Sequence, residues 1–482
     1  MKKTLLSICL CGFLCANDLI DSPKNTISEN FILDLNYLKT LPKNTKRDFL
    51  INEYLKKDKI SSNQAYEALG LISDINNELF YNFALKYGHD ETSAVALCMN
   101  MENNQLLNSY ADCIINGLDL KKASLLSSYD LKIVIQKIKN RYPLYSKKLE
   151  VISSSIPFTR LIVQKESDFY DIFFNVDSSF REKYFDYKLP KRTLKKIYKN
   201  KVNFEKFLKI VLTNENFRNL NKTFDDLDDE NLNSYSSFYL ALNAIKSDDY
   251  NKAYNYLNNA KNKTDNKLLV KRILFLEYLI TKDKTILKQL SLSEDFDLYS
   301  YISNELLGKK SNYKPNFDLL DKFQKTLKPL DKNIIALLFA ISKSQSNLQI
   351  DKVSKDFKVG ITQIKPIWIK GLLKDQENYN LNSFFVLEDN LNYAKLYLNS
   401  LNIKSKNPFV FLFKYNQDIQ GLKKVENLKI NKKGDDLLNS YIGILPVLEQ
   451  NEEFLLWYVL SYNQLEKNPK KHLKISAILK SL

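Results

Sequence analysis

Histidine and cysteine, the residues that most often act as catalytic bases, nucleophiles and metal ligands, are rare in this sequence. Only two histidines, His89 and His472, occur in 482 residues. They are too few for a histidine-rich metal site, and they argue against most catalytic triads, in which a histidine takes the proton. Any chemistry must therefore depend mainly on carboxylates. We expect no bound metal ion and no cofactor.

The N-terminus has the layout of a secretory signal peptide. Two lysines at positions 2–3 precede an apolar run at residues 5–14, and small or polar residues follow. We expect cleavage after Ala16, so that residues 1–16 are the signal peptide and the mature protein is periplasmic. A lipoprotein attached through Cys15 is the alternative, but the preceding residues, 12–14, form a poor lipobox.

Beyond the signal, no uninterrupted apolar stretch reaches about 18 residues, so we expect no transmembrane segment after cleavage. Three of the five cysteines lie within the signal, which leaves Cys98 and Cys113. An even pair in an oxidising compartment predicts a disulfide between neighbouring helices. Two buried free thiols are the alternative.

The chain carries 72 Lys and Arg against 56 Asp and Glu, a net charge of +16. The lysines are spread among Asn, Asp and Glu, as on solvated helix faces. A nucleic-acid-binding stripe would instead cluster its basic residues and interleave aromatics, so we expect no nucleic acid as partner. The excess still favours an anionic partner, and peptidoglycan, with its carboxylate-bearing stem peptides, would qualify.

Short amphipathic helices dominate the first two thirds of the sequence. Only 10 Gly and 11 Pro occur in the whole chain, too few for the many tight turns of a sandwich or barrel. Residues 239–260 are the clearest helical pair, because apolar residues recur at three- and four-residue spacing on both sides of a polar turn at 247–249. Such hairpins must stack on neighbours to bury their faces, which predicts an all-α fold with a superhelical solenoid over residues 17–318.

The pattern changes after a polar loop at residues 309–316. Residues 331–342 predict a helix that is apolar on nearly every side, which is typical of the middle of a compact domain. We therefore place a second domain at residues 319–482.

Several short blocks follow one another in this second domain. They are AISKSQSNL at 340–348, KVS at 352–354, GITQIKP at 360–366, NLNYAKLYL at 390–398, KYNQD at 414–418 and LPVLE at 445–449. In this order and spacing they resemble the catalytic domain of the soluble lytic murein transglycosylases. These enzymes have a lysozyme-like SLT domain and cleave peptidoglycan. The resemblance covers residues 320–465 motif by motif, and the solenoid only in general character.

The resemblance implies a ring-like α-superhelix carrying a lysozyme-like domain. In the family, one glutamate protonates the bond between N-acetylmuramic acid and N-acetylglucosamine. It then takes a proton from the muramoyl 6-hydroxyl, which closes a 1,6-anhydro ring. At the position of that glutamate this sequence has Gln345. The matching blocks imply that the substrate-binding residues are Ser346, Gly360, Gln363, Tyr415, Asn416 and Glu449.

A carboxamide at position 345 can neither give nor usefully accept a proton, whereas the family reaction needs both. Thr362, Gln417 and Asp418 also depart from the family pattern. Asp418 is a candidate replacement acid, although a weak one, and Glu449 corresponds to a supporting glutamate of the family. We therefore expect activity to be lost or impaired.

Three hypotheses follow for the function. The protein binds peptidoglycan glycan strands or cell-wall enzymes without cleaving, or it is an active lytic transglycosylase that uses another acid, or it is a helical scaffold for proteins of an envelope complex. Tyr415 is either a sugar-contacting residue or a packed core aromatic. An open cleft lined by Gln345, Gln363, Tyr415 and Glu449 would support sugar binding.

Overall fold

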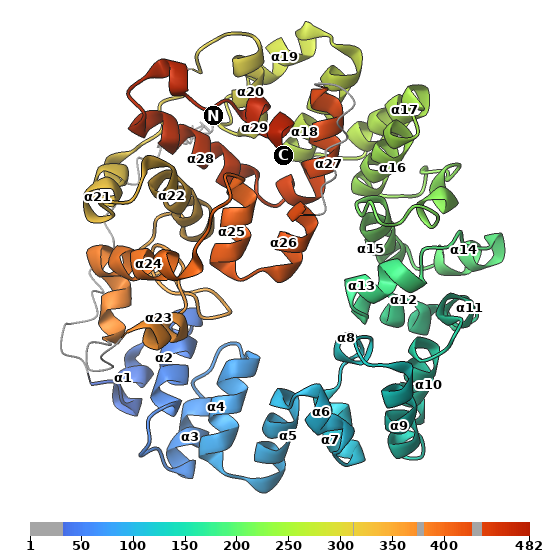
Figure 1. Cartoon of the computed structure of the whole chain (residues 1–482), viewed down its shortest axis with the longest axis vertical. Helices are drawn as coiled ribbons and strands as arrows, with labels where there is room; N and C mark the ends of the chain where they lie inside the picture. Colours follow the sequence, from blue (N-terminus) through green and yellow to red (C-terminus); the bar gives the residue numbers. More distant parts are fainter. Residues whose placement is uncertain (1–31, 312, 374–379, 427–435) are drawn as a thin grey trace, which may run out of the picture.

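The computed structural model describes residues 32–311, 313–373, 380–426 and 436–482 (Figure 1). Within these ranges helices are joined by loops, and there is no β-strand beyond isolated bridges at Val353, Val359 and Ile364. The predicted all-α fold is therefore confirmed. None of the helices in these ranges is long and apolar enough to cross a membrane. The signal peptide predicted at residues 1–16 and the lipoprotein alternative at Cys15 lie outside the described residues.

Helices α1 to α20 follow one another around a wide curve (Figure 1). The first half consists of α1 (Leu35–Thr40), α2 (Thr45–Leu55), α3 (Ser62–Leu69), α4 (Asn77–Tyr87), α5 (Asp90–Asn100), α6 (Asn103–Leu107), α7 (Ala111–Gly117), α8 (Leu120–Ala123), α9 (Ser128–Ile138), α10 (Pro143–Ile152) and α11 (Pro157–Ile162). The second half consists of α12 (Glu166–Asn175), α13 (Ser178–Tyr184), α14 (Lys191–Ile197), α15 (Lys201–Leu212), η1 (Asn221–Phe224), α16 (Ser234–Lys246), α17 (Tyr250–Asn262), α18 (Lys267–Thr281), α19 (Lys284–Ser291) and α20 (Leu298–Leu306).

The hairpin predicted at residues 239–260 is formed by α16 and α17. The Asp249 side chain accepts a hydrogen bond from the Lys252 backbone N–H at 3.1 Å, so the turn residue caps the second helix. Ala241, Ala253 and Ala260 are fully buried, and small side chains at these positions let the two helices approach closely.

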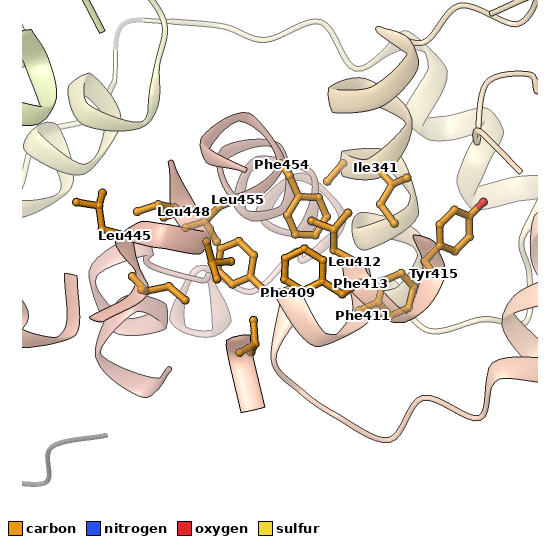
Figure 2. Packing of buried hydrophobic residues seen from close by; sticks show 14 of the residues in the cluster. Ile341, Phe409, Phe411, Leu412, Phe413, Tyr415, Leu445, Leu448, Phe454 and Leu455 are labelled. Atoms are coloured by element: carbon orange, nitrogen blue, oxygen red, sulfur yellow. The ribbon is translucent and has the colours of Figure 1, made fainter. Parts of the chain in front are cut away.

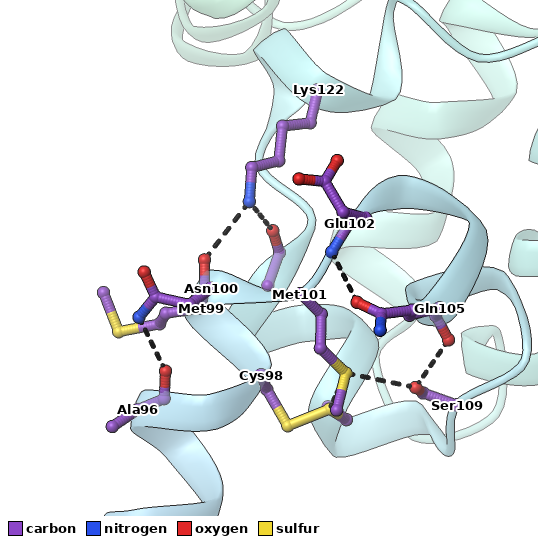
Figure 3. Close-up of a disulfide and its surroundings, with 11 residues drawn as sticks. Ala96, Cys98, Met99, Asn100, Met101, Glu102, Gln105, Ser109 and Lys122 are labelled. Atoms are coloured by element: carbon purple, nitrogen blue, oxygen red, sulfur yellow. Dashed lines mark hydrogen bonds between the residues drawn. A yellow bond between two sulfur atoms is a disulfide. The ribbon is translucent and has the colours of Figure 1, made fainter. Parts of the chain in front are cut away.

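Cys98 on α5 and Cys113 on α7 are joined by a disulfide, with Cα atoms 5.1 Å apart (Figure 3). Both side chains are buried, and the Met101 sulfur packs beside them, 3.6 Å from the Cys113 sulfur. The bond therefore links two neighbouring helices of the superhelix.

The remaining helices form the C-terminal region. They are α21 (Asp318–Thr326), α22 (Lys332–Ser346), α23 (Pro366–Leu372), η3 (Leu381–Phe385), α24 (Leu387–Leu401), α25 (Pro408–Asn416), α26 (Ile419–Glu426), α27 (Leu437–Leu448), α28 (Glu452–Leu465), η4 (Pro469–Lys471) and α29 (Ile475–Ser481). The almost wholly apolar α22 is buried at every position from Ile335 to Ser342, as its sequence predicts. It packs against α28, and Ile341 joins a cluster of Phe and Leu side chains from α25, α27 and α28 (Figure 2). The division into domains at residues 318 and 319 stays a prediction.

The superhelix meets the C-terminal region at both of its ends, so the chain closes into a ring (Figure 1). At the first junction, the Phe49 ring of α2 lies 5.7 Å from the Phe357 ring, and the Asn76 side chain donates to the Lys355 carbonyl at 2.7 Å. At the second junction, α18 and α20 pack on α27, α28 and α29, with Arg272 of α18 at the centre.

Candidate functional site

Gln345 lies in the last turn of α22, the helix through the core of the C-terminal region. Asp331 caps the start of this helix, and Asn347, in the left-handed conformation, ends it. The Gln345 side chain is partly exposed, while its neighbour Ser346 is buried. No described residue is hydrogen-bonded to the Gln345 amide, so its donors and acceptor are free to meet a ligand.

Ser346 connects α22 to the loop at residues 352–364. Its Oγ lies 2.6 Å from the Ser342 carbonyl oxygen and 2.7 Å from the Ile361 carbonyl oxygen. With only 2% of its surface exposed, Ser346 fixes the loop beside the end of the helix. This contact is structural, because the hydroxyl has its partners inside the protein.

Gly360 and Gln363 give this loop its shape. Gly360 has φ +76°, and its N–H donates to the Lys352 carbonyl at 2.9 Å. The buried Gln363 amide donates to the Gly360 carbonyl at 2.8 Å and lies 3.2 Å from the Lys352 carbonyl. The Gln363 donors are therefore used within the loop.

Asn390 holds the loop from the α24 side, a role that the motif comparison did not assign. Its Oδ1 accepts from the Thr362 N–H at 3.0 Å and from the Thr362 hydroxyl at 2.7 Å. Its Nδ2 donates to the Phe384 carbonyl at 2.9 Å. Asn390 stands in the block at 390–398, and a buried amide in an otherwise apolar helix face is the signal that could have identified it.

Tyr415 and Asn416 approach the same loop from the end of α25. Tyr415 has no exposed surface, its hydroxyl donates to the Thr362 carbonyl at 2.9 Å, and burial raises its pKa. Tyr415 is therefore a packed core aromatic and not a sugar-contacting residue. The partly exposed Asn416 accepts from the Lys358 ammonium at 2.8 Å. Burial lowers the pKa of Lys358, a residue that sequence reasoning also missed.

Glu449 does not join this group. Its carboxylate is bound at the second ring junction, 3.0 Å from Arg272 Nη1 and 3.3 Å from Lys209 Nζ, and it accepts from the Tyr239 hydroxyl at 3.0 Å. Figure 2 shows Leu448, the preceding residue, at the opposite end of the apolar cluster from Tyr415. The expected open cleft lined by Gln345, Gln363, Tyr415 and Glu449 is therefore wrong, since two members are buried and one lies elsewhere.

No described carboxylate is hydrogen-bonded to Gln345. Asp418 is exposed, and its Oδ1 accepts from the Gly421 N–H at 2.9 Å as α26 begins. Asp356 accepts from the Ser354 hydroxyl at 2.6 Å. Among the residues that the structure describes, no three His, Cys, Asp or Glu side chains are gathered as metal ligands. The Gln345 amide can therefore offer hydrogen bonds to a ligand.

Among the cavities lined by the described residues, two lie at or near the second ring junction. The larger one has a volume of about 1110 Å³ and lies between α12, α13 and α15 on one side and α26 and α27 on the other. The smaller one, of about 520 Å³, lies beside Arg272 and Tyr239. Glu449 lines both, and Gln345 lines neither.

No protein-family model matches the sequence, and no curated protein matches it. Among solved structures, the chain is similar to an inactive mutant of the lytic transglycosylase Slt from Pseudomonas aeruginosa, which carries a single glutamate-to-glutamine substitution. The identity is 11% and the TM-score 0.41, over 89% of this chain and 83% of that chain.

Proposed function

We propose that the protein is a lytic-transglycosylase-like protein of the periplasm that binds the glycan strands of peptidoglycan without cleaving them. The observation that carries this proposal is Gln345. It occupies the position that the motif resemblance gives to the catalytic glutamate, its amide has no described partner, and an amide cannot shuttle a proton.

The other acids considered from the sequence do not fill this role. The family reaction needs one group that first gives a proton to the glycosidic oxygen and then takes one from the muramoyl hydroxyl. Asp418 is exposed, and its carboxylate accepts the hydrogen bond from the Gly421 N–H at the start of α26. The Glu449 carboxylate is held by Arg272 at the ring junction.

The loop beside Gln345 is held in place by hydrogen bonds within the protein. Ser346, Asn390 and Tyr415 bind its backbone or Thr362 from three different helices, and they need no acid to do so. A site of this kind can retain its surface for sugar hydroxyl and acetamido groups after the proton shuttle is lost. The protein is then expected to bind glycan strands without cleaving them.

The cleavage test is incubation of purified peptidoglycan sacculi with the protein, followed by analysis of the soluble products. We expect no 1,6-anhydromuropeptides, because loss of acid–base catalysis costs about 10²–10⁴-fold and here one residue would do both steps. Abundant anhydro product from the natural sequence would overturn the proposal. The Gln345→Glu variant, run in parallel, reports whether a carboxyl at this position is sufficient to give cleavage.

The binding test is sedimentation with insoluble sacculi. We expect the natural protein to sediment and the Gln345→Ala variant to bind about 3–10-fold more weakly, the effect of losing one or two hydrogen bonds to a sugar. Ser344→Ala is the matched control, because the Ser344 hydroxyl is satisfied within α22 by the Ala340 carbonyl at 2.8 Å. Equal binding by all three proteins would exclude a glycan contact at Gln345.

A further inference from the structure

The larger cavity is separate from Gln345, which does not line it. It lies inside the ring, where α26 and α27 face α12, α13 and α15 (Figure 1). Its volume of about 1110 Å³ exceeds the roughly 300–1,000 Å³ of most small-molecule sites. The space therefore suits a segment of a chain molecule better than a small metabolite.

The acidic side chains of the cavity wall are all engaged by partners. The contacts are Asp119 with the Lys122 N–H at 2.7 Å, Asp171 with Lys148 at 2.7 Å, Glu182 with Asn214 and Asn216 at 2.8 Å each, Glu215 with Lys246 at 3.6 Å, and Glu449 with Arg272 at 3.0 Å. Most of these partners are not part of the cavity wall. The charges of Asp171, Glu215 and Glu449 are thus compensated by cations outside the cavity wall, whereas Asp119 and Glu182 are held by uncharged donors.

Five basic side chains of the same wall form no ion pair with a described residue: Lys121, Arg181, Lys206, Lys423 and Lys424. Lys206 lies 4.3 Å from the centre of the Phe174 ring, and Arg181 Nη2 donates to the Val176 carbonyl at 3.0 Å, so neither contact neutralises a charge. These five cations outnumber the two wall carboxylates that lack a cationic partner, Asp119 and Glu182, so positive charge is in excess around the cavity. The cavity is therefore a positively charged chamber.

These cations come from opposite sides of the chamber. Lys121 belongs to α8 and Lys423 to α26. The positive charges of both side chains reach Asp177, which caps the start of α13. Burial would raise the pKa of Asp177, but hydrogen bonds from Ser179 and these two positive charges lower it overall. One phosphate would require donors that converge on a point, whereas charges spread around a wall match several separate anionic groups.

The rest of the lining is rich in groups that suit a peptide. The wall carries the side-chain amides of Gln420 and Gln450, which can bond a peptide backbone, and the aromatic rings of Tyr145 and Phe174. We propose that this chamber binds an acidic peptide segment, whose carboxylates meet the five unpaired cations while the amides bond its backbone. Binding here does not depend on Gln345 or on any sugar.

The test uses a fluorescein-labelled hexaglutamate peptide and anisotropy with the purified protein. We expect binding that weakens strongly between about 50 and about 300 mM salt, because the contacts are ionic. The triple variant Lys206→Gln, Lys423→Gln, Lys424→Gln is expected to bind at least about tenfold more weakly, since it removes three of the cations that face the peptide. All three lysines are exposed, so the substitutions leave the fold intact, as circular dichroism would confirm.

The matched control removes the same amount of charge outside the chamber, through Lys467→Gln, Lys470→Gln and Lys471→Gln near η4. It is expected to keep the affinity of the natural protein, as is Gln345→Ala. Equal losses in the two triple variants, or hexaglutamine binding as well as hexaglutamate, would overturn the proposal. Displacement of the peptide by inorganic phosphate at matched ionic strength would also overturn it, because the chamber would then bind anions in general. Failure here would leave the sacculus-binding test unaffected.

Discussion

Replacing Arg272 by methionine is expected to destabilise the protein by about 3–5 kcal/mol, the cost of breaking a buried ion pair by removing one partner. Only 3% of Arg272 is exposed. Its Nε donates to Glu452 at 2.7 Å, its Nη1 lies 3.0 Å from Oε1 of Glu449, and its Nη2 donates to the Glu449 carbonyl at 2.9 Å. One guanidinium of α18 thus holds two carboxylates of the C-terminal region, and the ring should loosen at this junction without it.

The loss of stability in the Arg272→Met variant should depend on pH. Burial raises the pKa of Glu452 even though the charge and hydrogen bond of Arg272 oppose the shift. Without Arg272 the pKa of the folded state rises further above that of the unfolded chain. The folded variant then holds a proton that the unfolded chain releases, so its stability falls as pH rises above the ordinary carboxyl range. Urea denaturation at several pH values should show a smaller deficit near pH 4 than near pH 7.

An ion pair at the first ring junction provides the control, because its loss is expected to have little effect on stability. Lys355 and Asp74 form an ion pair there at 2.8 Å, with side chains that are 85% and 62% exposed. Lys355→Met should therefore leave the free energy of unfolding almost unchanged, because water screens an exposed pair. If Arg272→Met were as mild as Lys355→Met, the buried charges would not be what stabilises the second junction.

The features that sequence predicted correctly are local ones. The pair α16 and α17 is specified by residues 239–260 alone, through helical spacing, small contact residues and a capping aspartate. The buried helix α22 is likewise specified by its own apolar run. Both follow from the 3.6-residue period, which needs no knowledge of distant partners.

The features that sequence did not predict depend on distant contacts. Glu449 matches a family motif, but 177 residues separate it from Arg272, and no local sequence pattern predicts that the two side chains pair. Tyr415 matches a motif as well, yet only the fold decides whether its hydroxyl faces a ligand or the Thr362 carbonyl. A motif identifies residue types in order; it does not determine which side chains the surrounding helices bury.

Gly360→Ala is expected to destabilise the C-terminal region by about 2–5 kcal/mol. Alanine in the left-handed conformation costs about 1–2 kcal/mol, and overpacking a buried site adds about 1–3 kcal/mol. At φ +76°, a Cβ at position 360 would lie closer than 3.0 Å to both the Asn390 side chain and the Phe384 carbonyl. Those groups already hydrogen-bond to each other, so neither can move without breaking the contact that holds the loop. Thermal and urea unfolding would measure the loss.

Gly443→Ala is the matched substitution, because Gly443 lies inside α27 and an added Cβ there meets nothing within 4 Å. It should stabilise the protein by about 0.5–1 kcal/mol, the difference in helix propensity between alanine and glycine. The same added methyl group is thus expected to act in opposite directions at two positions of one region. A Gly360→Ala variant as stable as Gly443→Ala would mean that the loop beside Gln345 can relax. In that case the hydrogen bonds of Asn390 and Tyr415 would not be what preserves its shape.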